Sequence, residues 1–127
     1  MSAGLAMAAA ECGADIERVE RELRGAMARM RDSGWRFGPY FRMRVDGHPQ
    51  CCAIGALAES FYEAERLLAI PYEAVLDIGF GFDEQPGDLA AELGEEAVTP
   101  WHRLGARLRA FGDQLHQQSA AAAGGAS

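Results

Sequence analysis

Lysine is absent from this chain, and all twelve basic residues are arginines. The Gly-Lys-Ser/Thr signature of a phosphate-binding loop is therefore missing. Cysteine is scarce: Cys12, Cys51 and Cys52 are an odd number, which argues against a disulfide framework and favours a reduced, cytoplasmic protein. No apolar run is long enough to cross a bilayer, and the apolar segment 1–10 lacks the basic residues that begin a signal peptide. These absences argue against a P-loop nucleotide-binding protein, a disulfide-rich secreted protein and a membrane protein.

The remaining composition is that of one folded domain. The chain has 127 residues, of which 49% are hydrophobic, and this is enough for a core. We expect a flexible N-terminus at 1–12, a single globular domain at 13–116 and a disordered tail at 117–127. The net charge of −7 argues against double-stranded nucleic acid as a partner, because the phosphates would be repelled.

Two amphipathic helices are predicted near the ends of the domain. Apolar residues at spacings of three and four predict a first helix over 15–31, with Asp15 as its N-cap. Thr99 and Pro100 are typical of a helix start, and a similar apolar seam follows them. Because the two seams share their spacing, we expect these helices to pack antiparallel. The predicted core residues are Ile16, Val19, Leu23, Met27 and Met30 in the first helix and Trp101, Leu104, Leu108, Phe111 and Leu115 in the last.

A β-hairpin is predicted after the first helix. Alternation over 41–45 predicts a strand with Phe41, Met43 and Val45 buried. The turn signal Asp46-Gly47 leads to a returning strand over 48–51, which Pro49 would confine to the edge of the sheet.

Short helices should complete the fold. We expect one helix over 52–69, a helical turn over 72–78, a loop over 79–87 anchored by Phe80 and Phe82, and a helix over 89–93 capped by Asp88. The predicted fold class is α+β, mostly α, with four or five short helices packed around a small two-stranded hairpin.

A strongly acidic segment lies between residues 77 and 96. It contains seven acidic and no basic residues, so its charge of −7 equals that of the entire chain. Such a surface assists encounter with a basic partner. We therefore predict a protein with a basic surface as the partner, and a homodimer is a further alternative. The predicted binding residues are Asp83, Glu84, Asp88, Glu92, Glu95 and Glu96.

The adjacent cysteines allow a catalytic hypothesis. Cys52 should begin a helix, where the helix dipole and free amides stabilise a thiolate. His48 lies four residues upstream and Asp83 could orient it, which would complete a Cys-His-Asp nucleophile set. The alternative, which we favour, is that both cysteines pack as small hydrophobic residues.

An arginine-rich strand allows a third hypothesis. Arg36, Arg42 and Arg44 alternate with aromatic residues, a pattern that binds single-stranded nucleic acid by charge and stacking. The alternative is an ordinary strand with one solvated face, which is the preferred interpretation.

Metal sites fit the sequence poorly. His48, Cys51 and Cys52 have the wrong spacing for zinc, and segment 77–88 lacks the order of oxygen ligands of a calcium loop. We predict no metal and no cofactor.

Two blocks of sequence carry a resemblance. Residues 40–57 read Tyr-Phe-Arg-Met-Arg-Val-Asp-Gly-His-Pro-Gln-Cys-Cys-Ala-Ile-Gly-Ala-Leu. This stretch resembles the Asp-Gly-Arg and Cys-Cys-Ala-Leu-Gly-Ala-Leu block of a family of small actinobacterial and phage proteins of unknown function. Residues 82–87, Phe-Asp-Glu-Gln-Pro-Gly, resemble the Phe-Asn-Asp-x-Pro-Gly block that follows in that family. The resemblance covers about residues 20–115 and implies a fold and an origin, but no activity. Asp83 and Glu84 replace the asparagine and aspartate that are usual there.

The leading hypothesis is a small, non-catalytic protein-binding module that uses its acidic face. One form of it is a phage or mobile-element inhibitor of a host defence protein. A thiol-dependent enzyme centred on Cys52 and a single-stranded nucleic-acid binder remain alternatives.

Overall fold

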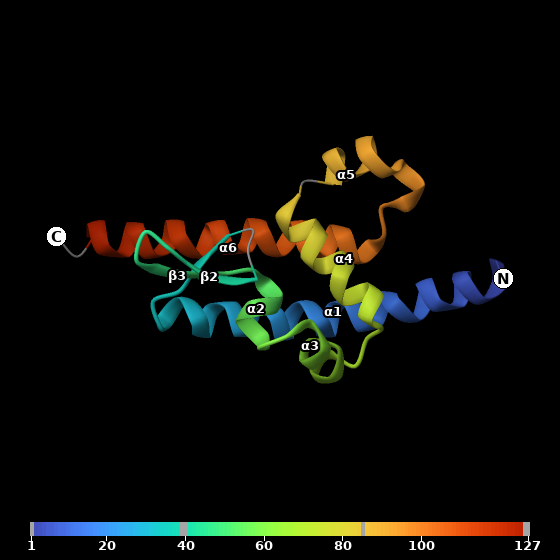
Figure 1. Cartoon of the computed structure of the whole chain (residues 1–127), viewed down its shortest axis with the longest axis horizontal. Coiled ribbons are helices and arrows are strands. Elements are labelled where there is room, and N and C mark those ends of the chain that lie inside the picture. Colours follow the sequence, from blue (N-terminus) through green and yellow to red (C-terminus); the bar gives the residue numbers. More distant parts are fainter. Residues whose placement is uncertain (1, 39–40, 85, 126–127) are drawn as a thin grey trace.

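The computed structural model describes residues 2–38, 41–84 and 86–125, and their side chains within 16–38, 41–84 and 87–117. It confirms an α+β fold that is mostly α (Figure 1). The described elements are α1 (Ser2–Asp32), β1 (Arg36–Phe37), β2 (Arg42–Val45), β3 (His48–Cys51), α2 (Ala53–Leu57), α3 (Phe61–Leu68), α4 (Tyr72–Asp83), α5 (Pro86–Leu93), the 3-10 helix η1 (Glu95–Ala97) and α6 (Pro100–Gly125).

The long helices α1 and α6 lie side by side and run in the same direction (Figure 1). Glu20 pairs with Arg107 at 3.2 Å, and the Arg24 guanidinium lies 4.6 Å from the Phe111 ring centroid. Residue numbers thus rise together along both helices. The predicted antiparallel packing was wrong because the intervening sheet and helices return the chain to the end at which α1 begins.

Both long helices extend beyond their predicted limits. Helix α1 begins at Ser2 rather than Asp15, since the alanine-rich segment before Asp15 favours helix. Helix α6 continues to Gly125, through the segment expected to be a tail. The division into flexible ends and a globular domain stays a prediction.

The sheet has three strands in the order β1-β3-β2, not the two that were predicted. Strand β3 is central, so the prediction that Pro49 confines it to an edge was wrong. The proline is tolerated because β1 pairs only with Gln50 and Cys51, whereas Pro49 faces Arg44 of β2 alone. The Asp46-Gly47 turn is confirmed, with both residues at positive φ, as a tight hairpin requires.

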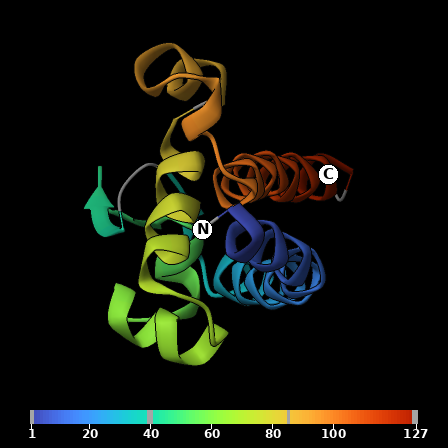
Figure 2. The same cartoon turned by 90° about the vertical axis from the view of Figure 1, so that its right-hand side faces the viewer.

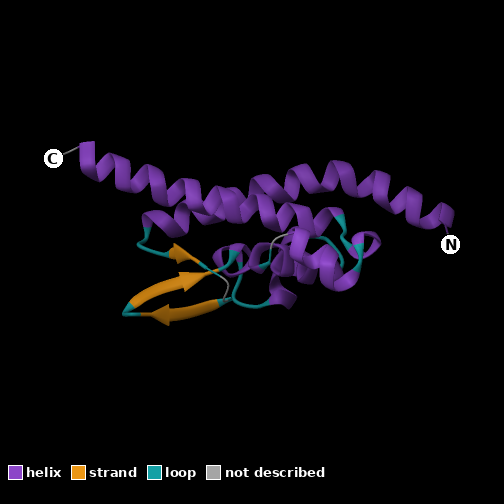
Figure 3. Ribbon diagram, turned by 90° about the horizontal axis from the view of Figure 1, so that it is seen from above, coloured by secondary structure: helices purple, strands orange, loops and turns teal. Residues whose placement is uncertain are grey.

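The predicted burial of the hairpin was only partly right. Met43 is 44% exposed, although the alternation placed it inside. The hairpin projects to one side of the helical body (Figure 3). The neighbouring residues Arg42 and Met43, whose side chains point to opposite faces of β2, are both exposed, so neither face of this strand is fully buried. In β2 and β3 the fully buried residue is Cys51, at the end near the helices.

The predicted helix over 52–69 is two helices. Ala58 adopts an extended conformation after α2, and Ser60 caps α3, its hydroxyl oxygen accepting a hydrogen bond from the Glu63 N–H at 3.0 Å. The Glu63 carboxylate in turn accepts from the Glu59 N–H at 3.3 Å. Serine followed three residues later by glutamate is a helix-start signal, so the break was readable in the sequence.

Helix α4 includes most of the segment predicted as a loop. It continues through Gly79 and Gly81 to Asp83 and crosses α6 (Figure 2). A Cβ on Gly81 would collide with the His102 carbonyl group, and one on Gly105 would collide with that of Ile78. These glycines therefore allow close approach of two helix backbones, which offsets their low helix propensity.

The core follows the predicted apolar seams. Val19, Leu23, Met27, Leu104 and Leu108 are completely buried, and Phe82 is 1% exposed, whereas Phe80 is 53% exposed. None of the helices in the described residues meets the length and hydrophobicity of a membrane-spanning segment.

Candidate functional site

Four of the seven acidic residues of segment 77–96 lie on a lobe formed by α5 and η1, residues 86–97, which we call the acidic lobe. It lies beyond α4 and α6 at one side of the molecule (Figures 1 and 2). Leu89, 3% exposed, anchors α5, which begins at Pro86, so Asp88 lies in its first turn and is not the predicted cap. Within the described residues, none of the lobe carboxylates forms an ion pair. The exposed lobe carboxylates are Asp88, Glu92, Glu95 and Glu96.

Glu84, the remaining predicted binding residue beside Asp83, is half-buried just before the lobe. Its Oε2 atom is inaccessible and has no hydrogen-bond partner among the described residues. Glu84 therefore contributes less open surface than the four lobe carboxylates.

A polar network that the sequence analysis missed fixes the start of α6 to α4. His102 is 5% exposed; its Nδ1 accepts a hydrogen bond from the Thr99 N–H at 2.9 Å, and its Nε2 lies 3.3 Å from Asp77 Oδ1. The Thr99 hydroxyl donates to Asp77 Oδ2 at 2.9 Å and accepts from the His102 N–H at 3.3 Å. The signal was the predicted N-cap Thr99 followed three residues later by a polar residue. This network holds the point at which the acidic lobe rejoins the helical body.

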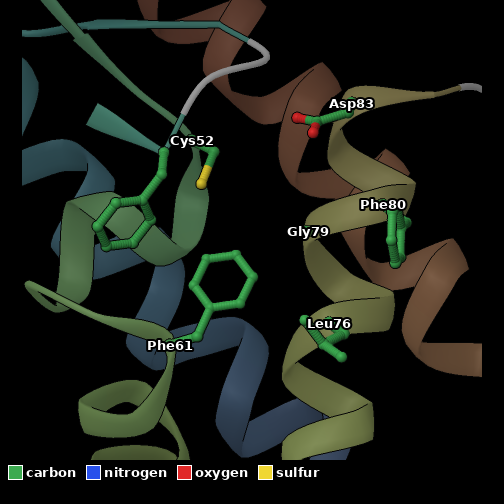
Figure 4. A pocket seen from close by; sticks show the side chains of 7 residues that line it. Cys52, Phe61, Leu76, Gly79, Phe80 and Asp83 are labelled. Carbon is green, nitrogen blue, oxygen red and sulfur yellow. The ribbon is translucent and has the colours of Figure 1, made fainter. Parts of the chain in front are cut away.

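A second feature is a pocket of about 100 Å³ between the end of the sheet, α2, α3 and α4, which we call the Cys52 pocket (Figure 4). Cys52 lies at the start of a helix, as predicted; it is the N-cap of α2, and its Sγ accepts a hydrogen bond from the Gly55 N–H at 3.4 Å. The lining residues are Phe41, Cys52, Phe61, Leu76, Gly79, Phe80 and Asp83.

The Cys52 thiol is poorly suited to nucleophilic chemistry. It is 3% exposed, and burial raises its pKa, an effect to which the negative charge of Asp83 adds and which the hydrogen bond from Gly55 opposes. Burial likewise raises the pKa of Cys51 to about 12. A reactive cysteine needs the opposite shift, toward the thiolate.

The hypothetical Cys-His-Asp set is only partly assembled. Asp83 and Cys52 line the same pocket, but His48 does not line it. His48 is exposed at the turn end of β3, opposite Val45, so three strand residues separate it from Cys52. The structure thus brings together the thiol and the carboxylate without the imidazole that would transfer the proton.

Asp83 stands at the mouth of the pocket at the end of α4. Partial burial of its carboxyl group raises the pKa to about 6, although the Arg109 guanidinium lowers it and Glu84 adds to the rise. Arg109 itself donates to the Phe82 carbonyl oxygen at 3.1 Å. Within the described residues, Asp83 has no ion-pair partner.

The arginines of the predicted nucleic-acid face are exposed, but two have contacts within the chain. Arg42 donates to the Gly55 carbonyl oxygen at 2.9 Å, and its guanidinium lies 5.6 Å from the Trp35 ring centroid. Arg44 donates to the Gly47 carbonyl oxygen at 3.1 Å. These contacts give Arg42 and Arg44 a structural use, whereas none is recorded for the Arg36 guanidinium in the described part of the chain.

Metal ligands do not cluster in the part of the chain that is described: no three His, Cys, Asp or Glu side chains lie close enough to hold an ion. Comparison with protein-family models, with curated proteins and with solved structures gave no match. The resemblance to the family with the Cys-Cys block therefore stays a prediction.

Proposed function

We propose that this protein is a small, non-catalytic protein-binding module whose acidic lobe contacts a basic surface of its partner. The observation that carries the proposal is the lobe itself, with four exposed carboxylates and no ion pair to them within the described residues. The segment 77–96 has the net charge of the entire chain, −7, so the remainder is neutral. Such segregation of charge favours fast, oriented encounter with a basic surface.

The lobe also offers apolar surface for contact. Leu93, at the end of α5, is 57% exposed and lies in sequence between Glu92 and Glu95. An apolar side chain surrounded by charges is the arrangement of a contact core with a polar rim. A partner that normally binds phosphate groups would fit this lobe, and we propose inhibition of such a host protein in the cytoplasm as the biological setting.

The experiment compares retention of partner proteins by a lobe variant and a matched control. The lobe variant is Asp88→Asn with Glu92→Gln, Glu95→Gln and Glu96→Gln. The control neutralises four exposed carboxylates elsewhere, through Glu17→Gln, Asp46→Asn, Glu73→Gln and Asp113→Asn.

Proteins from a host lysate that bind the immobilised wild type at low salt and elute at high salt should bind the control equally. They should be lost from the lobe variant. Equal retention by all three proteins would refute the role of the lobe.

A further inference from the structure

The Cys52 pocket is nearly apolar but has one carboxylate at its mouth. Its walls come from aromatic and aliphatic side chains, and two of them, Phe41 and Phe61, pack edge to face with centroids 5.3 Å apart. The backbone of Gly79 leaves one side open, since a Cβ there would only touch the Phe61 ring at 3.4 Å. Figure 4 shows Cys52 and Phe61 facing α4 across the pocket, with the Asp83 carboxylate turned toward the Cys52 side.

The size of the pocket restricts its occupant. A cavity of about 150 Å³ is known to hold a benzene molecule. A pocket of about 100 Å³ therefore suits a side chain such as leucine, isoleucine or methionine and is too small for tryptophan. Phe80, 53% exposed, extends the apolar surface at the edge and would cover part of a backbone lying across the opening.

Charge restricts the occupant further. The Asp83 carboxylate has no ion-pair partner in the described part of the chain, and Glu84 follows it directly. Asp83 ends α4, and Asp88 lies in the first turn of α5. The pocket therefore adjoins the acidic lobe. Although Arg109 offsets part of the charge of Asp83, a basic residue of a bound segment would face several carboxylates where the segment leaves the pocket toward the lobe.

We propose that the Cys52 pocket receives one aliphatic side chain from a partner protein segment in which the neighbouring residue is an arginine or lysine that pairs with Asp83. This inference rests on the proposed protein-binding function and names the kind of segment recognised. The buried aliphatic side chain supplies binding energy, as central anchors do, and the basic neighbours supply orientation toward the lobe.

The test begins with selection of random dodecapeptides displayed on phage against the wild-type protein. Peptides that bind should place leucine, isoleucine or methionine beside an arginine or lysine. The strongest is then made synthetically, and its Kd is measured by calorimetry for the wild type and for variants.

Gly79→Leu fills the pocket, and Asp83→Asn removes the charge at its mouth. Each should weaken the Kd about tenfold, the effect of losing one anchor contact. Gly25→Leu is the matched control, because it places the same side chain on α1, where a Cβ meets only the end of Arg29 at 3.5 Å. This control should bind the peptide like the wild type.

Two further measurements keep the test decisive if Gly79→Leu does not fold. Gly79→Ala adds a methyl group that the Phe61 contact tolerates, and it should weaken binding to a smaller degree. The bound peptide should also slow alkylation of Cys52 by iodoacetamide in the wild type, because the peptide closes the route to the thiol.

The inference is overturned if the selected peptides lack the aliphatic-basic pair, or if folded Gly79 variants bind unchanged and Cys52 is not protected. Peptides that are weakened only by the lobe variant would overturn this inference and leave the proposed function standing. Peptides insensitive to both changes would overturn both.

Discussion

At the scale of single residues, burial is the main cause of the raised pKa values of Cys52 and Asp83. Cys52 occupies a helix N-cap, which favours a thiolate, yet the loss of solvent outweighs this effect and raises its pKa. The hydrogen bond from the Gly55 N–H, at 3.4 Å, does not replace the hydration that a thiolate loses on burial. The sequence position of Cys52 therefore suggests a reactive thiol, whereas its burial in the fold makes the thiol unreactive.

We predict that Cys52 reacts with iodoacetamide at neutral pH much more slowly in the folded protein than in urea, because its thiolate is scarce and buried. Mass spectrometry of the modified peptide measures the rate. His48→Ala should leave that rate unchanged. Rapid labelling that depends on His48 would instead restore the thiol-enzyme hypothesis.

Asp83 gives a pH-dependent prediction. Its pKa is raised from 3.8 to about 6, so the folded protein holds this proton more tightly than the unfolded chain between those values. The free energy of unfolding therefore falls as pH rises from about 4 to 6. Asp83→Asn should be more stable than the wild type at pH 7.5, by less than about 1 kcal/mol, because the carboxyl group is only partly buried and water screens its charge. Thermal unfolding at pH 4 should show no such difference.

At the scale of secondary-structure elements, the α4–α6 crossing depends on glycine. Gly81 and Gly105 each face a backbone carbonyl of the opposite helix, and backbone cannot move aside as a flexible side chain can. The crossing also positions Gly79 and Asp83 at the Cys52 pocket and holds the base of the acidic lobe.

Gly81→Ala and Gly105→Ala should each destabilise the protein by about 3 kcal/mol, because the helices must separate. Gly87→Ala is the control: its Cβ meets nothing within 4 Å, and alanine favours helix α5. Urea denaturation measures the free energy of unfolding of each variant. Gly81→Ala as stable as Gly87→Ala would contradict the close crossing.

The start of α3 gives a second prediction at this scale. Ser60→Ala removes the hydroxyl that accepts from the Glu63 N–H and should cost about 1 kcal/mol of stability. Ser60→Asp should retain the cap and most of the stability. Thermal unfolding distinguishes the two, and equal losses would show that the cap does not hold α3.

At the scale of the whole molecule, charge is separated from the core. Outside segment 77–96 the charges of the chain sum to zero, and the net negative charge lies within that segment. Because the lobe carboxylates form no ion pairs within the described residues, they repel one another without compensation.

The lobe variant removes four negative charges and changes the net charge from −7 to −3. Because the repulsion between carboxylates is reduced, the variant should be slightly more stable than the wild type at low salt. The difference should shrink at about 1 M salt, where the Debye length is about 3 Å. Thermal unfolding at two salt concentrations measures it. A loss of stability independent of salt would mean that these carboxylates hold the lobe together.

Local patterns in the sequence were sufficient for the buried faces of the long helices, the Asp46-Gly47 turn, the helix starts at Cys52 and Thr99, and the segregation of charge. Each of these depends on neighbours within a few positions along the chain. The break at Ser60 was also encoded locally, through Glu63, and was overlooked.

Other features depend on residues far apart in the sequence. Gly81 is needed inside helix α4 because the backbone of His102 leaves no room for a side chain there, and Met43 is exposed although the strand pattern places it inside. The parallel direction of α1 and α6 and the meeting of Cys52 with Asp83 likewise come from the path of the chain between them. Periodicity identifies which face of an element is buried. Only packing between distant elements decides what that face contacts, which glycines adopt a helical conformation and where a pocket remains.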